Sequence, residues 1–419
     1  MIHKHWDYTK VKFLHIELST FCNARCPVCP RFASLPDRSS SHITIPGLVL
    51  ESISFEDFVK WFPPEFASNL EHVIFCGTGG DPMMAKDVLE ITRYLCEHGV
   101  SIQFNTNGGM RNTDFWVSLA KIMQTNKGNR GHNRHVVFSI DGLHDTNHLY
   151  RVNVPFDAVF RNAKAFIDAG GTAHWDFLIF KHNEHQIDEA AHLATATGFE
   201  RFTPKKALGF TPDWDGEVYN RVVRTVTGEI SHIIEPPSEE HANYLSKSVL
   251  SRTHEEKINL VQISKHIKDN PITGNDKNKI YEKAKLQYIP TQAESTTDIV
   301  CKSLIHYNDT QEVYINAAGS VFPCCYVGSR MQSETTRELD AQVFSEIDNF
   351  GLDKISLKNY SLKEIVEGEF LRTVFENKWG KQFPEGMLVC NETCGENSAL
   401  DRINAYSVQK NAIARALDP

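Results

Sequence analysis

The chain has no long apolar run, and this absence excludes one class of protein. No stretch approaches the roughly 20 consecutive apolar residues that a membrane-spanning helix needs. The first residues, Met1 to Lys12, are polar and aromatic and lack the apolar segment of a secretory signal. We therefore expect a cytoplasmic protein with reduced cysteines and no membrane partner.

An excess of basic residues is also absent. Lys and Arg number 44 against 53 Asp and Glu, which gives a net charge of −9. Proteins that bind nucleic acid are usually basic over their docking face, so this balance weighs against such a partner. Apolar residues make up 41 % of the 419 residues and charged residues 23 %. This composition predicts a folded chain, and at roughly 100–200 residues per domain its length predicts about two domains.

The ten cysteines are too few for a disulfide-dense scaffold of this length. Cys22, Cys26 and Cys29 form a C-x3-C-x2-C triplet in a loop that also holds Pro27 and Pro30. Core positions on a strand alternate, so three thiols in one loop indicate metal ligation. No fourth Cys or His follows closely, as a closed zinc site would require. Three thiolates fit an iron–sulfur cube that keeps one iron open for a ligand.

The other cysteines fall into two groups. Cys76 and Cys96 lie singly in apolar stretches, and we expect both to be small buried core residues. The remaining five lie in the last third of the chain: Cys301, Cys324, Cys325, Cys390 and Cys394.

Residues 13–207 alternate between β-rich and helical patterns, with a repeat of about 30 residues, the size of a βα unit. The expected strands are Phe13–Ser19, His72–Gly77, Ser101–Asn105, His135–Asp141, His174–Phe180 and Arg201–Lys205. The expected helices are Phe55–Phe62, Asp87–His98, Asp114–Gln124, Phe156–Ala169 and Glu184–Thr197. This alternation predicts a parallel sheet, either an open barrel or doubly wound, with ligands at the carboxyl ends of the strands. The cysteine triplet follows the first strand at that end.

The rest of the chain has other patterns. Residues 31–47 are rich in Ser and Pro and predict a loop. Residues 211–300 are polar and charged and partly helical in pattern, so we expect an insertion or bridge between a barrel of residues 1–210 and a C-terminal domain of residues 301–419. The elements expected in that α+β domain are a hairpin turning at Ala317–Gly319, a helix from Ser361 to about Trp379, and a terminal helix at Asn397–Ala414.

The loop CNARCPVC resembles the signature of the radical S-adenosylmethionine (radical SAM) superfamily. Gly79, Gly80 and Asp81, followed by Pro82, resemble its G-G-E-P segment with Asp in place of Glu. The segment 104–108 (FNTNG) resembles its T-N-G segment, and Ser139 to Gly142 resembles its S-x-D-G segment. Each of these segments ends the expected strand in the expected order, and a Tyr–Arg pair at 150–151 also fits. At position 28, where the family usually has an aromatic residue, the chain has Val.

The resemblance implies a partial (βα)6 barrel in which Cys22, Cys26 and Cys29 hold a [4Fe–4S] cluster that binds SAM. It implies that SAM is contacted by Gly79, Gly80, Asp81, Asn105, Asn107, Ser139, Asp141 and Arg151. It also implies reductive cleavage of SAM to methionine and a 5′-deoxyadenosyl radical, which removes hydrogen from the substrate. The electron would come from an external donor such as flavodoxin or ferredoxin.

The C-terminal cysteines resemble the auxiliary-cluster pattern of the SPASM and twitch subgroup. Only five are present, which fits the shorter twitch domain with one extra [4Fe–4S] cluster; its ligands would be Cys301, Cys324, Cys390 and Cys394. Cys325 is left as a spare thiol, a replacement ligand or a hydrogen donor to a substrate radical. The subgroup implies oxidation, cross-linking or epimerisation of an amino-acid-like small molecule or a peptide.

Two rival interpretations stay open: a radical SAM enzyme that acts on RNA, and a non-catalytic zinc-binding module. Lys205 and Lys206 end the sixth expected strand and are candidates for binding a carboxylate or phosphate, with a solvated rim as the alternative. Trp175 and Phe177 alternate with Asp176 on the fifth strand, and we assign the two aromatic residues to the core or the barrel lining.

Overall fold

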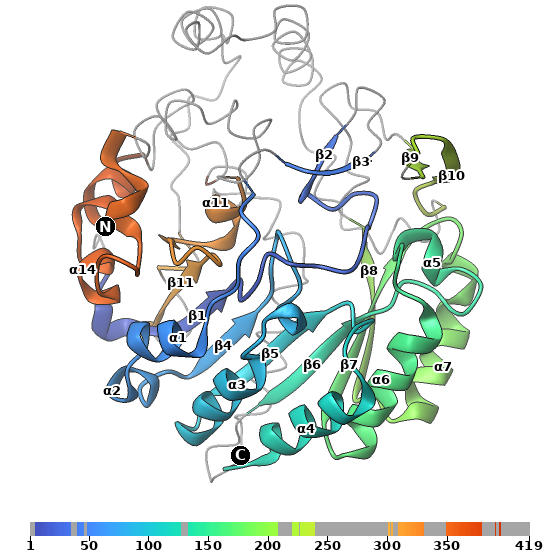
Figure 1. Ribbon diagram of the computed structural model, residues 1–419, viewed down its shortest axis with the longest axis horizontal. Coiled ribbons are helices and arrows are strands. Elements are labelled where there is room, and N and C mark those ends of the chain that lie inside the picture. The colour runs from blue at the N-terminus through green and yellow to red at the C-terminus, as the bar shows by residue number, and fades with distance from the viewer. Residues whose placement is uncertain are drawn as a thin grey trace, which may run out of the picture.

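The computed structural model describes residues 5–34, 40–45, 48–126, 133–207, 220–225, 227–238, 301, 303–304, 309–330, 349–378, 390 and 394. Its largest element is an eight-stranded sheet with the order β12-β11-β1-β4-β5-β6-β7-β8 (Figure 1). The strands are β1 (Val11–Ile16), β4 (His72–Phe75), β5 (Ser101–Thr106), β6 (Arg134–Ser139), β7 (Thr172–Ile179), β8 (Arg201–Lys206), β11 (Gln311–Ile315) and β12 (Val321–Phe322).

The strands from β1 to β8 form the predicted parallel series. Each pairs in parallel with the next strand along the chain in this sheet, from β1 with β4 to β7 with β8. The helices between them are α1 (Phe55–Trp61), α2 (Pro64–Ala67), α3 (Val88–Glu97), α4 (Thr113–Gln124), α5 (Asn147–Tyr150), α6 (Phe156–Asp168) and α7 (Ile187–Thr197). Short 3-10 helices are η1 (Tyr8–Lys10), η2 (Pro82–Met84) and η3 (Glu184–Gln186). The five predicted helices and six predicted strands are confirmed.

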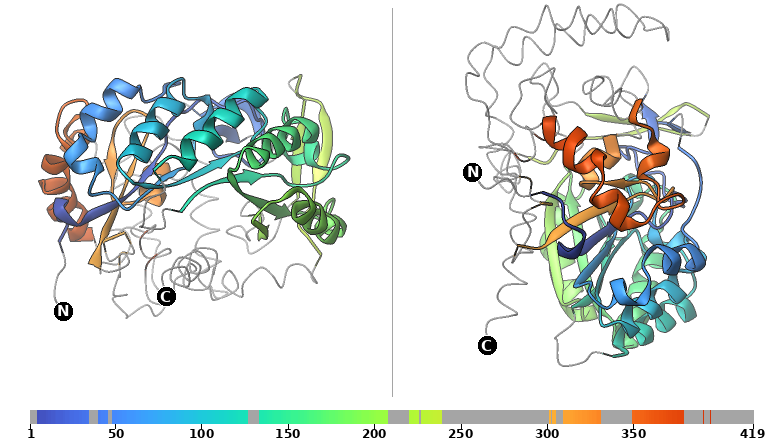
Figure 2. Two further views of the ribbon diagram at one scale, coloured as in Figure 1. Left: turned by 90° about the horizontal axis from the view of Figure 1, so that it is seen from below. Right: turned by 90° about the vertical axis from the view of Figure 1, so that its left-hand side faces the viewer.

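The two faces of the sheet differ in chemistry. The outer face is apolar and packs against the helices (Figure 2): Phe75 lies 6.4 Å from Phe58 of α1, and Phe138 lies 5.1 Å from Trp116 of α4, between ring centroids. Because side chains alternate along a strand, the residues next to these outward-facing ones in each strand point to the inner face. The inner face is polar and includes His15, Glu17, Gln103, Asn105, His135, His174 and Asp176.

The C-terminal hairpin is confirmed, and it extends the barrel sheet. β11 pairs in parallel with β1, with Tyr314 beside His15, and β12 returns antiparallel to β11. The turn contains Gly319 at φ +83°, and a Cβ there would lie 2.8 Å from the Trp61 ring, so glycine is required. The sheet is therefore continuous across the domain boundary expected at residue 301.

The C-terminal helices are shorter than expected and pack beside the N-terminus. Ser361 and Glu364 form the expected capping box, but the single helix to Trp379 is wrong, because α14 ends at Val366, just before Gly368. Glycine weakens a helix interior, and a separate π-helix follows. Arg372 of that helix donates to Trp6 O at 2.7 Å, and Figures 1 and 2 show this side-by-side arrangement. The described helices here are α11 (Cys325–Arg330), η6 (Leu352–Ile355), α14 (Leu362–Val366), the π-helix η7 (Phe370–Phe375) and η8 (Glu376–Lys378).

Two small sheets replace predicted irregular structure. The loop expected at 31–47 contains an antiparallel pair, β2 (Phe32–Ser34) and β3 (Ser40–Thr44). In the region 211–300, the described residues form the antiparallel pair β9 (Arg221–Arg224) and β10 (Ile230–Ile234), and the rest of the region, with its partly helical pattern, lies outside the described residues. Strands this short leave little periodicity to detect in the sequence. The terminal helix expected at 397–414 lies outside the described residues. Within the described part of the chain, no helix is long and apolar enough to cross a membrane.

Candidate active site

The cysteine triplet lies in the loop that leaves the carboxyl end of β1. Two turns shape this loop: Cys29 N donates to Cys26 O at 3.1 Å, and Phe32 N donates to Cys29 O at 3.2 Å. A third bond, from Arg25 N to Val152 O at 2.9 Å, ties the loop to the segment after α5. All three thiols are free of disulfides. The structure thus holds the three predicted ligands in one loop fixed by backbone hydrogen bonds.

Three N–H donors point at the sulfur atoms of this loop. Ala24 N lies 3.4 Å and Asn107 Nδ2 lies 3.7 Å from Cys22 Sγ. Arg151 Nη1 lies 3.7 Å from Cys26 Sγ. Hydrogen bonds to the sulfur ligands are among the factors that set the reduction potential of an iron–sulfur cluster. Two of these donors come from segments that follow β5 and β6, so the neighbouring strand ends converge on the loop.

Burial makes the three thiols weak acids. It raises the pKa of Cys22 to about 11 and that of Cys29 to about 12, and it raises the pKa of Cys26. A metal centre binds the deprotonated form, so it supplies the positive charge that buried thiolates need. Among the described residues, no three His, Cys, Asp or Glu side chains are arranged to hold a single metal ion. Three thiols in one loop match the number that an iron–sulfur cube with one open iron takes.

The loop after β4 passes so close to β1 that it requires glycine. A Cβ on Gly80 would lie 2.1 Å from Ser19 O, a backbone atom that has no freedom to move aside. Gly79 N donates to Oε1 of Glu17, a fully buried side chain just after the end of β1. Tyr314 Oη of β11 donates to Oε2 of the same Glu17 at 3.4 Å. Sequence reasoning missed Glu17, although a carboxylate between two apolar positions of a strand was the available signal.

Asp81 joins the ends of β4 and β5. Its carboxylate accepts from Thr106 Oγ1 at 2.9 and 3.0 Å, from Asn107 N at 2.8 Å and from Met83 N at 3.0 Å. Burial raises the pKa of Asp81, and these hydrogen bonds oppose the rise. Asn107 Nδ2 donates in turn to Asn23 Oδ1 of the cysteine loop at 2.9 Å. Asp81 therefore positions Asn107 against the loop.

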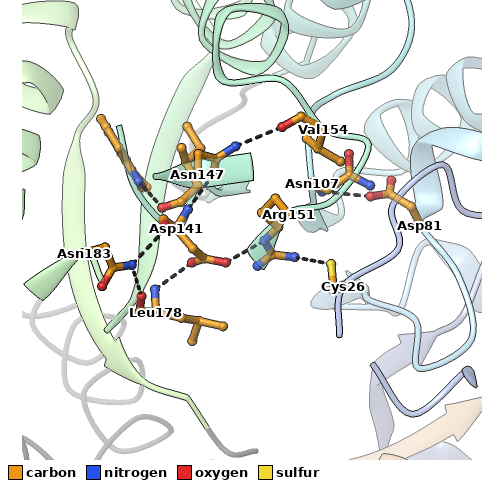
Figure 3. Close-up of polar contacts among 11 residues, drawn as sticks. Cys26, Asp81, Asn107, Asp141, Asn147, Arg151, Val154, Leu178 and Asn183 are labelled. Atoms are coloured by element: carbon orange, nitrogen blue, oxygen red, sulfur yellow. Dashed lines mark hydrogen bonds and ion pairs between the residues drawn. The ribbon is translucent and has the colours of Figure 1, made fainter. Parts of the chain in front are cut away.

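Arg151 connects the end of β6 to the cysteine loop (Figure 3). Its Nε donates to Asp141 Oδ2 at 2.5 Å, while its Nη1 faces Cys26. The other carboxylate oxygen of Asp141 accepts from Leu178 N of β7 at 2.7 Å. Burial opposes the charge of Arg151, but Asp141 and Cys26 together raise its pKa above the ordinary value. Burial raises the pKa of Asp141, and the Arg151 charge opposes that rise.

The structure brings most of the predicted SAM-binding residues to one end of the barrel. Gly79, Gly80, Asp81, Asn107, Asp141 and Arg151 surround the cysteine loop through the contacts described above. Ser139 ends β6 on the inner face, level with Asp176 of β7. Asn105 lies on the inner face of β5, where its Oδ1 accepts from Gln103 Nε2 at 2.9 Å. Contact of these residues with SAM stays a prediction.

Cys76 is not the buried core residue that its apolar neighbours in the sequence suggested. Cys96 is fully buried on α3 as expected, but Cys76 is partly exposed. Burial among protein groups raises the pKa of Cys76, while a hydrogen bond with Asn105 lowers it. Phe75 before it faces the helices, so the thiol of Cys76 turns to the polar inner face.

The predicted auxiliary ligands also approach one another. Burial raises the pKa of Cys301, and Cys324 and Cys394 add to the rise. Burial likewise raises the pKa of Cys324 to about 12, with a contribution from Cys394. Cys390 is buried as well. These interactions place Cys301, Cys324 and Cys394 in one neighbourhood, as the predicted ligand set requires.

Cys325 lies at the inner face of the sheet. Burial raises its pKa well above the ordinary value, and after Cys324 the contributing groups are Glu312 of β11 and Cys76. Cys325 in turn contributes to the raised pKa of Tyr314, whose main cause is burial. Its thiol is therefore next to the barrel interior as well as to the C-terminal cysteines.

Comparison with known protein families bears on the zinc-module interpretation. Residues 16–194 match the Radical SAM superfamily. This match assigns residues 16–194 to the radical SAM superfamily. Membership in this superfamily implies SAM and a [4Fe–4S] cluster as cofactors, and it favours the iron–sulfur interpretation of the triplet over a zinc module.

Individual relatives of this radical SAM protein are distant. Over 141 residues it is 29 % identical to the mycofactocin maturase MftC of Mycolicibacterium smegmatis, an alignment that covers 33 % of this chain and 34 % of the maturase. Streptococcus suis SuiB bound to S-adenosylmethionine is similar at 13 % identity and a TM-score of 0.43, over 76 % of this chain and 61 % of SuiB. The AdoMet-bound anSMEcpe is similar at 15 % identity and a TM-score of 0.44, over 97 % of this chain and 100 % of anSMEcpe. The chain thus spans about a third of the length of the curated relative that it matches.

Proposed function

We propose that this protein is an enzyme that reductively cleaves SAM and uses the resulting radical to remove hydrogen from an amino-acid-like molecule or a peptide. One observation carries the proposal: three cysteines, one buried and two half-buried, share one loop at the carboxyl end of β1, and N–H donors from the segments after β5 and β6 point at two of their sulfurs. Such strand ends are where parallel α/β folds bind their ligands.

Cys22, Cys26 and Cys29 are the proposed ligands of the SAM-binding cluster. When bound together, the reduced cluster and SAM supply a 5′-deoxyadenosyl radical that abstracts hydrogen from the substrate. The protein's own part is positional. Asn107 and Arg151 donate N–H groups to the sulfurs, and Asp81 and Asp141 hold these two donors in place.

Gly79 and Gly80 offer backbone without a Cβ beside the end of β1, where the amino group of the bound methionine would approach. Ser139 at the end of β6, level with Asp176 of β7, and Asn105 on β5 face the inner side and are proposed to line the rest of the SAM site. The electron donor is proposed to be a flavodoxin or ferredoxin.

A second [4Fe–4S] cluster is proposed on Cys301, Cys324, Cys390 and Cys394. The observation behind it is the mutual interaction of Cys301, Cys324 and Cys394. After anaerobic reconstitution we expect about eight iron atoms per chain, and about four after Cys22, Cys26 and Cys29 are all changed to Ala. A matched control is Cys96→Ala, which removes a buried thiol outside both sets and is expected to leave the iron content unchanged. Equal iron in the triple variant and the wild type would reject the proposed division of ligands.

Cys325 is proposed to donate a hydrogen atom to the substrate radical, because its thiol lies between the C-terminal cysteines and the inner face. Cys325→Ala should keep both clusters and 5′-deoxyadenosine formation but lose deuterium incorporation from D2O into the product. A product that carries solvent deuterium in that variant would remove Cys325 from this role. RNA as substrate stays the alternative prediction, which a salt-dependent mobility shift with tRNA would support.

A further inference from the structure

An ion pair crosses the inner face of the sheet between β7 and β8. Lys205 Nζ lies 2.5 Å from Asp176 Oδ2, and the side chains are 31 % and 16 % exposed. Lys205 stands level with Leu178, and Asp176 stands level with Thr203 of β8. The sequence left open whether Lys205 was a binding residue or a solvated rim residue. The pairing shows that its ammonium group turns to the carboxylate of the neighbouring strand.

Two polar atoms beside this ion pair lack hydrogen-bond partners. Asp176 Oδ1 and Thr203 Oγ1 are both buried, and neither bonds to any group in the described part of the chain. Buried carboxylate and hydroxyl oxygens in folded proteins nearly always have a partner, so an unpartnered pair calls for an explanation. The two residues are register partners on adjacent strands, and both point to the inner face. Each residue therefore has one unpartnered oxygen, and the two residues stand side by side on the inner face.

This pair of atoms lies close to the candidate active site. Asp176 is level with Ser139 at the end of β6, and Ile140 N donates to Asp176 O at 3.1 Å. Asp141, two residues past Ser139, holds Arg151 beside the cysteine loop. At about 3.3 Å per residue, the unpartnered atoms are some two residues deeper in the barrel than Asp141. A ligand that reached from the cysteine loop into the barrel would meet them.

The charge of the site restricts its ligand. Lys205 already neutralises Asp176, so the second carboxylate oxygen needs a hydrogen-bond donor and no further cation. Because the ion pair is close to neutral overall, it gives little net attraction to a free ammonium group or to a free carboxylate. A neutral group that donates at one atom and accepts at the next meets the demands of Oδ1 and of the Thr203 hydroxyl. The N–H and C=O of a peptide bond have this arrangement.

We propose that Asp176 and Thr203, with Lys205 orienting the carboxylate, form a substrate-anchoring subsite for a backbone amide. The inference rests on the proposed function and makes its substrate class specific: a peptide or an amide-capped amino acid, in preference to a free amino acid. Lys205 acts as a positioning residue, because its contact with the ligand passes through Asp176.

The test uses the reconstituted full-length enzyme with SAM. The probes are the N-acetyl, N-methylamide derivatives of the common amino acids at millimolar concentration, with the matching free amino acids as comparison compounds. We expect at least one capped compound to raise the melting temperature more than its free counterpart does. Thr203→Val, which has the same shape without the hydroxyl, should weaken that compound's binding about fivefold, and Asp176→Asn about tenfold or more.

The control variant is Asp168→Asn, which changes a solvent-exposed pair with Lys164 and should bind the compound like the wild type. Unchanged affinity in both Thr203→Val and Asp176→Asn would overturn the proposal, and so would stronger binding of the free amino acids. A panel in which no capped compound binds would overturn the amide assignment. Formation of 5′-deoxyadenosine by the wild type on reduction tests the proposed function separately, since it needs no substrate. Thr203→Val keeps the ion pair intact, so the proposal can be judged even where Asp176→Asn does not fold.

Discussion

The ion pair between Arg151 and Asp141 should be the most costly polar contact of the site to break. The Asp141 side chain is 0 % exposed, that of Arg151 is 15 % exposed, and Nε lies 2.5 Å from Oδ2. Removing one partner of a buried pair leaves an uncompensated charge and typically costs about 3–5 kcal/mol. We therefore predict that Arg151→Met lowers the free energy of unfolding by about 3–5 kcal/mol at neutral pH.

The loss should depend on pH in a defined direction. Burial already raises the pKa of Asp141, and Arg151 opposes that rise, so its removal raises this pKa further. A carboxyl whose pKa is higher in the folded than in the unfolded state binds more protons when folded. Its free energy of unfolding then falls as the pH rises. The difference between the wild type and Arg151→Met should accordingly narrow as the pH is lowered from 8 toward 5.

Urea unfolding of the apoprotein, followed by circular dichroism at several pH values, measures this difference. Lys164→Met is the matched control, because Lys164 pairs with Asp168 at 2.8 Å on the surface with both side chains more than half exposed. That variant should lose at most about 0.5 kcal/mol. Adding Asp141→Asn to Arg151→Met should recover part of the loss. A loss below about 1 kcal/mol in Arg151→Met, or a difference that widens as the pH falls, would refute the reasoning.

Further predictions concern neighbouring groups. Burial lowers the pKa of His15 to about 4, and the unfolded state therefore binds more protons between about pH 6.5 and 4. As the pH falls through that range, the free energy of unfolding of the wild type should drop by up to about 3 kcal/mol because of this residue. His15→Gln keeps a donor for Cys76 O, and its free energy of unfolding, measured by urea titration, should depend less steeply on pH. Gly80→Ala should fail to bind SAM in equilibrium dialysis, because its Cβ would meet Ser19 O at 2.1 Å. Gly228→Ala strains a turn residue at φ +90°, but its Cβ meets no atom within 4 Å, so this variant should still bind SAM. Equal binding by both variants would contradict the close passage of Gly80 beside Ser19.

The central strands could be predicted because their outer faces are regularly apolar. Val73 and Phe75 on β4, like Phe104 on β5, alternate with inner residues and pack on helices or on each other. The glycine and cysteine segments then fall at strand ends, where local turns form. The same alternation contains the signal that Cys76 is an inner residue, since it follows the outward-facing Phe75. The apolar residues next to Cys76 in the sequence favoured a core position for it instead.

The role of the C-terminal hairpin could not be read from local patterns. β11 pairs with β1 across nearly the whole chain, with Tyr314 next to His15. Nothing in either strand specifies the other, because parallel pairing depends on the fold that brings the two edges together. The contact of Tyr314 with Glu17 depends on this pairing, so it could not be predicted from the sequence either.

The hydrogen bonds within the site could not be predicted from the sequence either. The resemblance assigned Asp81 to SAM, whereas the structure shows its carboxylate engaged by Thr106, Asn107 and Met83. The number of donors that reach Asp81 depends on how the ends of β4 and β5 meet, which the motif does not specify.

The measurement that bears most directly on the account is 5′-deoxyadenosine formation by the anaerobically reconstituted protein with SAM and a chemical reductant. The wild type and Cys96→Ala should form 5′-deoxyadenosine and methionine in equal amounts. The triple variant of Cys22, Cys26 and Cys29 to Ala should form neither product while it retains auxiliary iron. A wild-type protein that binds iron fully and leaves SAM intact, or a triple variant that still cleaves SAM, would contradict the account.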